Sequence, residues 1–102
     1  MVERRVTVGW AEGLHARPAS IFVRAATAAG VPVTIARTGD DAANSGNPVN
    51  AASMLAVLSL GAKGGEEVVL ASDAEDTTQA EAALDRLARL VAEGLEELPE
   101  TV

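Results

Sequence analysis

The sequence contains no cysteine and very few aromatic residues. The absence of cysteine excludes disulfide bonds, thiolate chemistry and metal sites ligated by cysteine. It is also compatible with a cytoplasmic location, which is the location we expect. The only aromatic residues are Trp10 and Phe22. Nucleic-acid-binding proteins usually combine stacking aromatics with a basic stripe, so we do not expect a nucleic acid as partner.

The chain also lacks long apolar runs. No stretch approaches the roughly 20 apolar residues that a membrane-spanning helix needs. The N-terminus has no apolar segment of the signal-peptide kind, so we expect no membrane insertion. Apolar residues still make up 48% of the 102 residues, which is enough for one modest core. We therefore expect a monomer with a single domain over residues 1–102, in which residues 93–102 form a frayed tail.

Basic residues are in the minority. Eight lysines and arginines oppose 15 acidic residues, which gives a net charge of −7. The two signs balance over residues 1–72, so the whole acidic excess lies in residues 73–102. This distribution is a second argument against a nucleic-acid partner.

Hydropathy patterns predict seven elements. Apolar residues alternate in the strands and recur at spacings of three and four in the helices. The predicted strands are residues 6–10, residues 31–36, a segment ending near Val49, and residues 66–71; the predicted helices are residues 16–29, residues 54–60, and a helix from a capping box at Thr78 and Glu81 to about Glu93. This order predicts an α+β fold, with helices packed on one face of a mainly antiparallel sheet.

In the helix over residues 16–29, apolar residues recur at spacings of three and four and predict one buried face made of Ala19, Phe22, Val23 and Ala26. The short helix over residues 54–60 is apolar nearly throughout, so we expect one side to be buried and the other exposed. We assign Leu58 to the buried side.

The single histidine, His15, lies directly before a predicted helix that begins Ala16-Arg17-Pro18. A helix start presents free N–H groups and the positive end of the helix dipole, which together bind anions such as phosphate. The Arg17 guanidinium adds a charge of suitable geometry, and a neutral imidazole is a nucleophile. This combination fits phosphoryl transfer onto and off the histidine. Spacing alone leaves open that His15 is only an exposed loop residue, and one histidine with scattered carboxylates makes no metal site.

Two segments of the chain resemble the HPr family, the histidine-containing phosphocarriers of the phosphoenolpyruvate:sugar phosphotransferase system. Residues 13–19, Gly-Leu-His-Ala-Arg-Pro-Ala, resemble the family's active-site motif. Residues 49–61 are similar to its regulatory-serine segment, and the resemblance covers about residues 3–93. It implies an open-faced β-sandwich, in which a four-stranded antiparallel sheet is covered on one face by three helices in the order βαββαβα.

The resemblance implies a covalent carrier and not an enzyme. His15 would accept a phosphoryl group on Nδ1 from enzyme I and pass it to an enzyme IIA domain of a sugar permease. The chain would need no cofactor, because phosphoenolpyruvate and Mg²⁺ are used by enzyme I. Arg17 and the backbone N–H groups of Ala16 and Arg17 would hold the phosphoryl group.

The resemblance also implies a docking surface and a regulatory site. Met54 and Leu55 match the family's apolar docking patch, although ordinary core positions would explain them equally, and Ser20 lies on the same rim. Arg24 could steer acidic partners or be a solvated helix charge. Ser53 matches the serine that an HPr kinase modifies in some bacteria, and it also has a structural explanation as a helix cap.

The chain departs from the family at several positions. The segment over residues 37–48 is longer than usual, and Ala52 and Ala56 stand where many relatives have lysine. Glu12 stands where relatives often have a small polar residue. Two alternative functions stay open: a carrier in a nitrogen-related phosphorelay, and a regulatory HPr-like protein that carries no phosphate.

Overall fold

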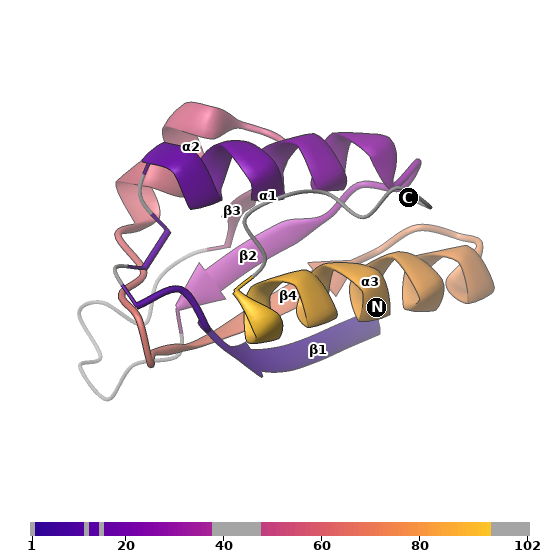
Figure 1. Cartoon of the computed structure of the whole chain (residues 1–102). Coiled ribbons are helices and arrows are strands. Elements are labelled where there is room, and N and C mark those ends of the chain that lie inside the picture. The colour runs from indigo at the N-terminus through magenta and orange to yellow at the C-terminus, as the bar shows by residue number, and fades with distance from the viewer. Residues whose placement is uncertain (1, 12, 15, 38–47, 95–102) are drawn as a thin grey trace.

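The computed structural model describes residues 2–11, 13, 14, 16–37 and 48–94 (Figure 1). The elements, in chain order, are β1 (Val2–Thr7), α1 (Ala16–Ala28), β2 (Thr34–Arg37), β3 (Val49–Asn50), α2 (Met54–Leu60), β4 (Glu67–Ser72) and α3 (Thr77–Glu93). This order confirms the predicted βαββαβα arrangement and the α+β class. The frayed tail expected for residues 93–102 falls almost entirely outside the described residues.

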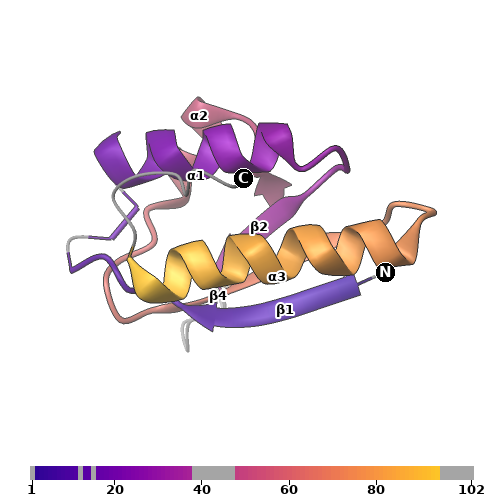
Figure 2. The same cartoon turned by 45° about the vertical axis from the view of Figure 1, so that its right-hand side comes forward.

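The four strands form one antiparallel sheet in the order β1-β4-β2-β3. The register places Val6 opposite Val68, and Ile35 opposite both Leu70 and Val49. Figures 1 and 2 show α1 and α3 on the same side of this sheet, with α2 beside α1. Among the helices formed by these residues, none has the length and apolar character needed to cross a lipid bilayer.

Two predicted strands have different limits in the structure, although their burial patterns are as expected. Val6, Val8 and Trp10 are all buried and alternate with exposed residues, but β1 spans Val2–Thr7 and so both begins and ends earlier than the predicted strand over residues 6–10. The strand ends early because the Gly9 N–H donates to the Val91 carbonyl of α3 and so leaves the sheet. Likewise β2 begins at Thr34, although the preceding Val33 is already buried.

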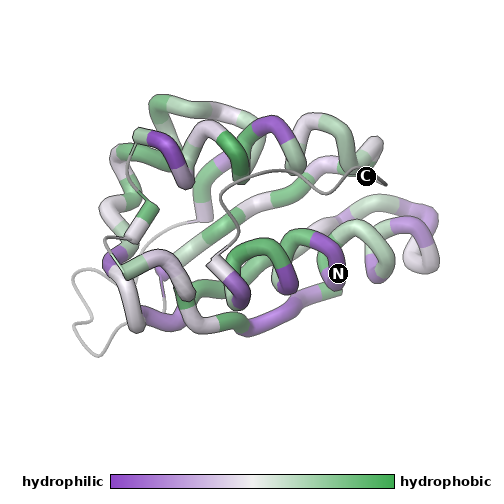
Figure 3. The backbone as a smooth tube through the Cα atoms, in the orientation of Figure 1, coloured by the Kyte–Doolittle hydropathy of each residue, from purple (hydrophilic) through white to green (hydrophobic). Residues whose placement is uncertain are grey.

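The core lies between the sheet and the helices. The alternation of hydrophobic and hydrophilic residues along α1 and α3 in Figure 3 is typical of helices with one buried face. On α1, Ala19, Phe22 and Ala26 of the predicted face are buried, whereas Val23 is partly buried and packs against the core. The largest fully buried side chains come from the strands β2 and β4 and from all three helices, so both the sheet and the helices contribute to the core: Phe22, Ile35, Val57, Val68, Leu70, Leu84, Leu87 and Val91.

The buried side of α2 differs from the prediction. Val57 is fully buried, whereas Leu58, which we assigned to the core, is 38% exposed. In a helix of only seven residues, apolar periodicity is too short to identify the inner face, which is decided by how the helix lies against its neighbours. The short helix is held at both ends by Ser53 as N-cap and by Gly61 in the left-handed conformation as C-cap.

The N-terminal cap of α3 also differs from the prediction. The capping residue is Asp76, whose carboxylate accepts a hydrogen bond of 3.0 Å from the Gln79 N–H, and the helix begins at Thr77. The predicted capping box of Thr78 and Glu81 is therefore wrong. Asp76 has the same three-residue spacing to its partner and is a stronger capping residue than threonine. The predicted end of the helix at Glu93 is confirmed.

The burial difference on α2 predicts different costs for two truncations. Val57→Ala removes two buried methyl groups and should lower the free energy of unfolding by about 2 kcal/mol. Leu58→Ala should lower it by less than about 1 kcal/mol, because the side chain already meets solvent. Urea unfolding of the two variants measures both values, and a larger cost for Leu58→Ala would contradict the assignment of the inner face.

Candidate functional site

The first turn of α1 is open to solvent. Ala16 and Arg17 are exposed, and the turn contains no acidic side chain. The free N–H groups and the helix dipole at this end favour an anion, and the Arg17 guanidinium adds positive charge. Pro18 has no N–H to offer, and its ring is buried. The structure thus leaves the predicted anion-binding groups of Ala16 and Arg17 accessible, while His15 itself lies outside the described residues.

The segment before α1 is anchored in the core. Leu14 is 3% exposed, and its N–H donates to the Ala62 carbonyl at 2.9 Å. The Gly13 N–H donates to the Trp10 carbonyl at 2.9 Å. We call residues 8–14 the site loop, of which Glu12 is not described, and residues 62–66 the bracing turn. Position 15 is therefore preceded by a buried, hydrogen-bonded residue and followed by a helix.

Glycines allow the site loop and the bracing turn to meet backbone against backbone. A Cβ atom added to Gly13, which has φ +82°, would lie 2.3 Å from the Ala62 carbonyl oxygen. A Cβ atom added to Gly64 would lie 2.3 Å from the Ala11 carbonyl oxygen. No larger residue fits at either position without moving one of the two segments.

The site loop also contacts the end of α3. The Gly9 N–H donates to the Val91 carbonyl at 2.8 Å, and an added Cβ on Gly9 would lie 2.3 Å from the Ala92 carbonyl oxygen. The helix ends at Gly94, whose φ of +61° is the left-handed conformation of a C-cap. The loop is therefore held between two segments that are distant in the sequence.

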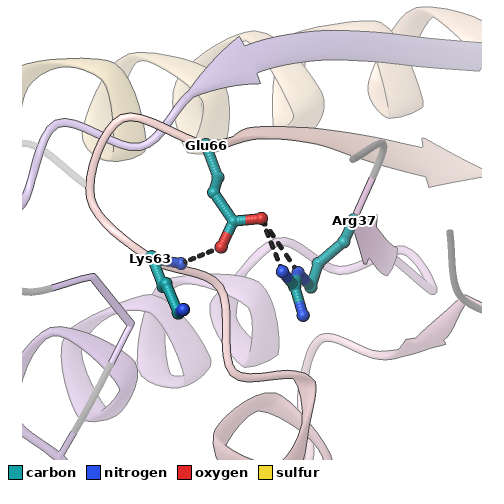
Figure 4. A network of polar contacts seen from close by, with 3 residues as sticks. All are labelled: Arg37, Lys63 and Glu66. Carbon is teal, nitrogen blue, oxygen red and sulfur yellow. Dashed lines mark hydrogen bonds and ion pairs between the residues drawn. The ribbon is translucent and has the colours of Figure 1, made fainter. Parts of the chain in front are cut away.

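A charged cluster lies on the bracing turn (Figure 4). One carboxylate oxygen of Glu66 accepts hydrogen bonds from Nε and Nη2 of Arg37 at 3.0 and 2.7 Å, and the other accepts the Lys63 backbone N–H at 2.7 Å. Burial acts to raise the pKa of Glu66. The hydrogen bonds from Arg37 and Lys63 and their positive charges outweigh it, so the pKa is lowered below the ordinary value and Glu66 is ionised at neutral pH.

The expected docking residues lie on two helices that pack together, α1 and α2. On α2, Leu55 is 77% exposed and Met54 is partly buried. On α1, Ser20 is partly buried and Arg24 is exposed. The position that sequence reasoning missed is Leu58, which lies one turn after Leu55 and adds to the exposed apolar area.

Ser53 acts as the N-cap of α2, as predicted from its position. Its Oγ accepts a hydrogen bond of 3.3 Å from the Ala56 N–H, and the residue is partly buried. Just before it, the Asn50 side chain accepts a hydrogen bond from the Ala52 N–H at 2.9 Å. The Ser53 hydroxyl therefore has the capping role, two residues before the exposed Leu55.

Sequence reasoning did not identify the bracing turn as part of the site. The predicted strand over residues 66–71 includes Glu66, but the residues before it match no predicted element. The contacts that matter join residues about 50 positions apart, such as Leu14 and Ala62. No periodicity in the chain signals such a pairing. In the part of the chain that the structure describes, no group of three histidine or acidic side chains is arranged to hold a metal ion.

Comparison with known proteins identifies one family. Residues 2–93 match the model of the family described as "PTS HPr component phosphorylation site". The chain is 78% identical, over the full length of both, to phosphocarrier protein HPr of Streptomyces coelicolor. It is 36% identical to the HPr-like protein Crh of Bacillus subtilis over 91% of this chain and 98% of that protein. The crystal structure of HPr from Bacillus anthracis is similar, with a TM-score of 0.73 at 33% identity, over 88% of this chain and 95% of the other.

The glycine contacts predict a large difference between two alanine variants. Gly65→Ala should cost only the backbone penalty of a positive φ, about 1–2 kcal/mol, because nothing lies within 4 Å of an added Cβ. Gly13→Ala has the same penalty and in addition forces the loop away from Ala62, which should cost about 1–3 kcal/mol more. Chemical unfolding of both variants tests this, and equal costs would contradict close packing at Gly13.

Proposed function

Because this chain belongs to the HPr family of phosphocarrier proteins, we propose that His15 is the residue that carries its phosphoryl group. The protein is a phosphoryl carrier rather than an enzyme: it takes the phosphoryl group from enzyme I and passes it to enzyme IIA of the phosphotransferase system. The family carries no cofactor. The observation that supports His15 most directly is that the only histidine of the chain immediately precedes the exposed first turn of α1.

In the proposed transfer, a ring nitrogen of His15 attacks the phosphorus atom held by enzyme I. A new N–P bond forms as the bond between phosphorus and enzyme I breaks. In the second transfer, enzyme IIA attacks the same phosphorus atom, and the N–P bond to His15 breaks. Such transfers depend mainly on positioning and on stabilisation of the charge on the phosphoryl oxygens. The anchored Leu14 on one side and α1 on the other supply the positioning.

We assign the charge stabilisation to Ala16 and Arg17. Their backbone N–H groups belong to the first turn of α1, where helices lack internal hydrogen-bond acceptors. The exposed Arg17 guanidinium can donate two parallel hydrogen bonds to phosphate oxygens. The absence of acidic residues from this turn supports the assignment, because a carboxylate there would repel the phosphoryl group.

We propose that enzyme I and enzyme IIA dock on the neighbouring surfaces of α1 and α2. The docking residues are Ser20 and Arg24 on α1 and Met54 and Leu55 on α2, to which the exposure of Leu58 adds a further apolar side chain. A small apolar contact suits a carrier, because it must release each partner quickly. Arg24 supplies a positive charge toward partners with acidic surfaces.

We further propose that Ser53 is a regulatory site for a serine kinase of the HPr kinase type. Its Oγ caps the start of α2, two residues before Leu55 of the proposed docking surface. A phosphate there would add about two negative charges and lie at a helix N-terminus, where it is well tolerated. The charge would disfavour docking of an acidic partner without unfolding the helix.

The role of His15 is tested by incubating the protein with enzyme I, Mg²⁺ and phosphoenolpyruvate. Intact mass and phosphorus NMR should show an acid-labile adduct on the unmodified protein and none on His15→Ala. Arg17→Ala should still form the adduct, at a rate lowered about tenfold or more, because a charge-assisted contact to the phosphoryl group is lost. An adduct on folded His15→Ala would overturn the assignment of the acceptor.

The role of Ser53 is tested with two variants that both keep a good N-cap. Ser53→Asp introduces a charge and should lower the rate of transfer from enzyme I about tenfold, whereas Ser53→Asn adds no charge and should leave the rate near normal. Transfer kinetics at equal protein concentration distinguish them. Equal rates for the two variants would contradict regulation by charge at this position.

A further inference from the structure

We propose that Glu66 is a positioning residue for phosphoryl transfer, acting through the bracing turn on the loop that precedes His15. The proposal rests on the assignment of His15 as the acceptor, and it adds a residue that does not touch the phosphoryl group. It is carried by an unbroken series of contacts from the Glu66 carboxylate to the Leu14 backbone.

The first contacts are those of the carboxylate itself, both of whose oxygens are used (Figure 4). One oxygen receives two hydrogen bonds from the guanidinium of Arg37, the last residue of β2. The other receives the Lys63 backbone N–H. The side chains of Arg37 and Glu66 are each only 21% exposed, so this pair is less screened by solvent than the other ion pairs of the described residues.

The second contacts close the bracing turn. The Glu66 N–H donates to the Lys63 carbonyl at 3.0 Å, while the Glu66 carboxylate accepts from the Lys63 N–H at 2.7 Å. Both polar backbone groups of Lys63 are therefore bound by the same residue. The two residues between them are Gly64 and Gly65, and glycine is the residue type with the greatest backbone freedom. The hydrogen bonds of Glu66 therefore restrict a turn whose own sequence is flexible.

The third contacts join the closed turn to the site loop. Val8 exchanges hydrogen bonds with the turn, its N–H donating to the Glu66 carbonyl at 2.8 Å and its carbonyl accepting the Gly65 N–H at 3.0 Å. At the far end, the Ala62 carbonyl accepts the Leu14 N–H at 2.9 Å. The turn therefore holds the loop at both ends, and the second of these ends directly precedes His15.

The ion pair between Arg37 and Glu66 links the bracing turn to the sheet. Arg37 and Glu66 lie on neighbouring strand segments, because the register pairs Arg37 with Val68. The pair therefore ties the turn to the middle of the sheet. Charge-assisted hydrogen bonds are about twice as strong as neutral ones, so a neutral side chain at position 66 would hold the turn less firmly.

The test compares Glu66→Gln with Glu67→Gln. The neighbouring Glu67 is paired at 3.3 Å with the exposed Arg5 of β1, and so serves as a matched control for removing one carboxylate. Hydrogen exchange of the Leu14 and Lys63 amides, followed by NMR, reports on the brace without any phosphoryl transfer. Phosphorylation by enzyme I, measured as kcat and KM, reports on its consequence.

For Glu66→Gln we expect the Leu14 and Lys63 amides to exchange about tenfold faster than in the unmodified protein. We expect kcat to fall about 5-fold or more and KM to change less than about twofold, because the docking surface is untouched while the reacting group is less well placed. Glu67→Gln should leave both exchange rates, kcat and KM near those of the unmodified protein. Arg37→Gln breaks the same ion pair from its other side and should reproduce the effects of Glu66→Gln. It takes the place of Glu66→Gln if that variant does not fold.

The proposal is overturned if Glu66→Gln and Arg37→Gln lower thermal stability while Leu14 exchange and kcat match those of Glu67→Gln, since the pair would then be merely structural. A failure of the proposed function looks different. In that case the unmodified protein forms no phosphoryl adduct on His15. The exchange measurements still show whether Glu66 holds the bracing turn against the site loop.

Discussion

The close approach of two backbones, the site loop and the bracing turn, is the constraint on which the arrangement of the site depends. Gly13 meets the Ala62 carbonyl, and Gly64 meets the Ala11 carbonyl, at separations that leave no room for a Cβ atom. Because the two segments touch directly, the hydrogen bond from Leu14 to Ala62 can form and the loop enters α1 at a defined place. The glycines make this approach possible but cannot make it rigid, which is the task we assign to Glu66.

A phosphoryl carrier has to combine a rigid acceptor region with a surface that binds only briefly. Here the two requirements fall on different parts of the chain. The backbone before α1 is anchored by the core, by α3 and by the bracing turn. The proposed docking residues instead lie on the outer faces of α1 and α2, where Leu55 and Leu58 are the large exposed apolar side chains among the described residues.

The charges of the chain follow the same division. The sequences of α1 and α2 contain Arg17 and Arg24 and no acidic residue. The acidic excess lies after residue 72, mostly in the residues that flank α3, because α3 itself has three acidic and two basic residues. The acidic residues are therefore absent from the two helices that form the proposed acceptor and docking surface. The negative charge of Glu66, which lies on the bracing turn, is balanced by the positive charge of Arg37 in their ion pair. In the proposed arrangement, a phosphoryl group beside α1 would meet the positive charge of Arg17 and the N–H groups of the first turn.

Local features of the chain were predictable from the amino-acid sequence alone. The order of the elements, the buried face of α1 and the cap at Ser53 follow from periodicity and capping chemistry, which act over a few residues. The candidate acceptor and its anion-binding groups were equally visible, because His15, Ala16 and Arg17 are contiguous. Tertiary structure alone decided the early end of β1, the burial of Val57 rather than Leu58, and the contact of Glu66 with Arg37. Each of these depends on which distant segments meet, and no local pattern in the chain encodes that meeting.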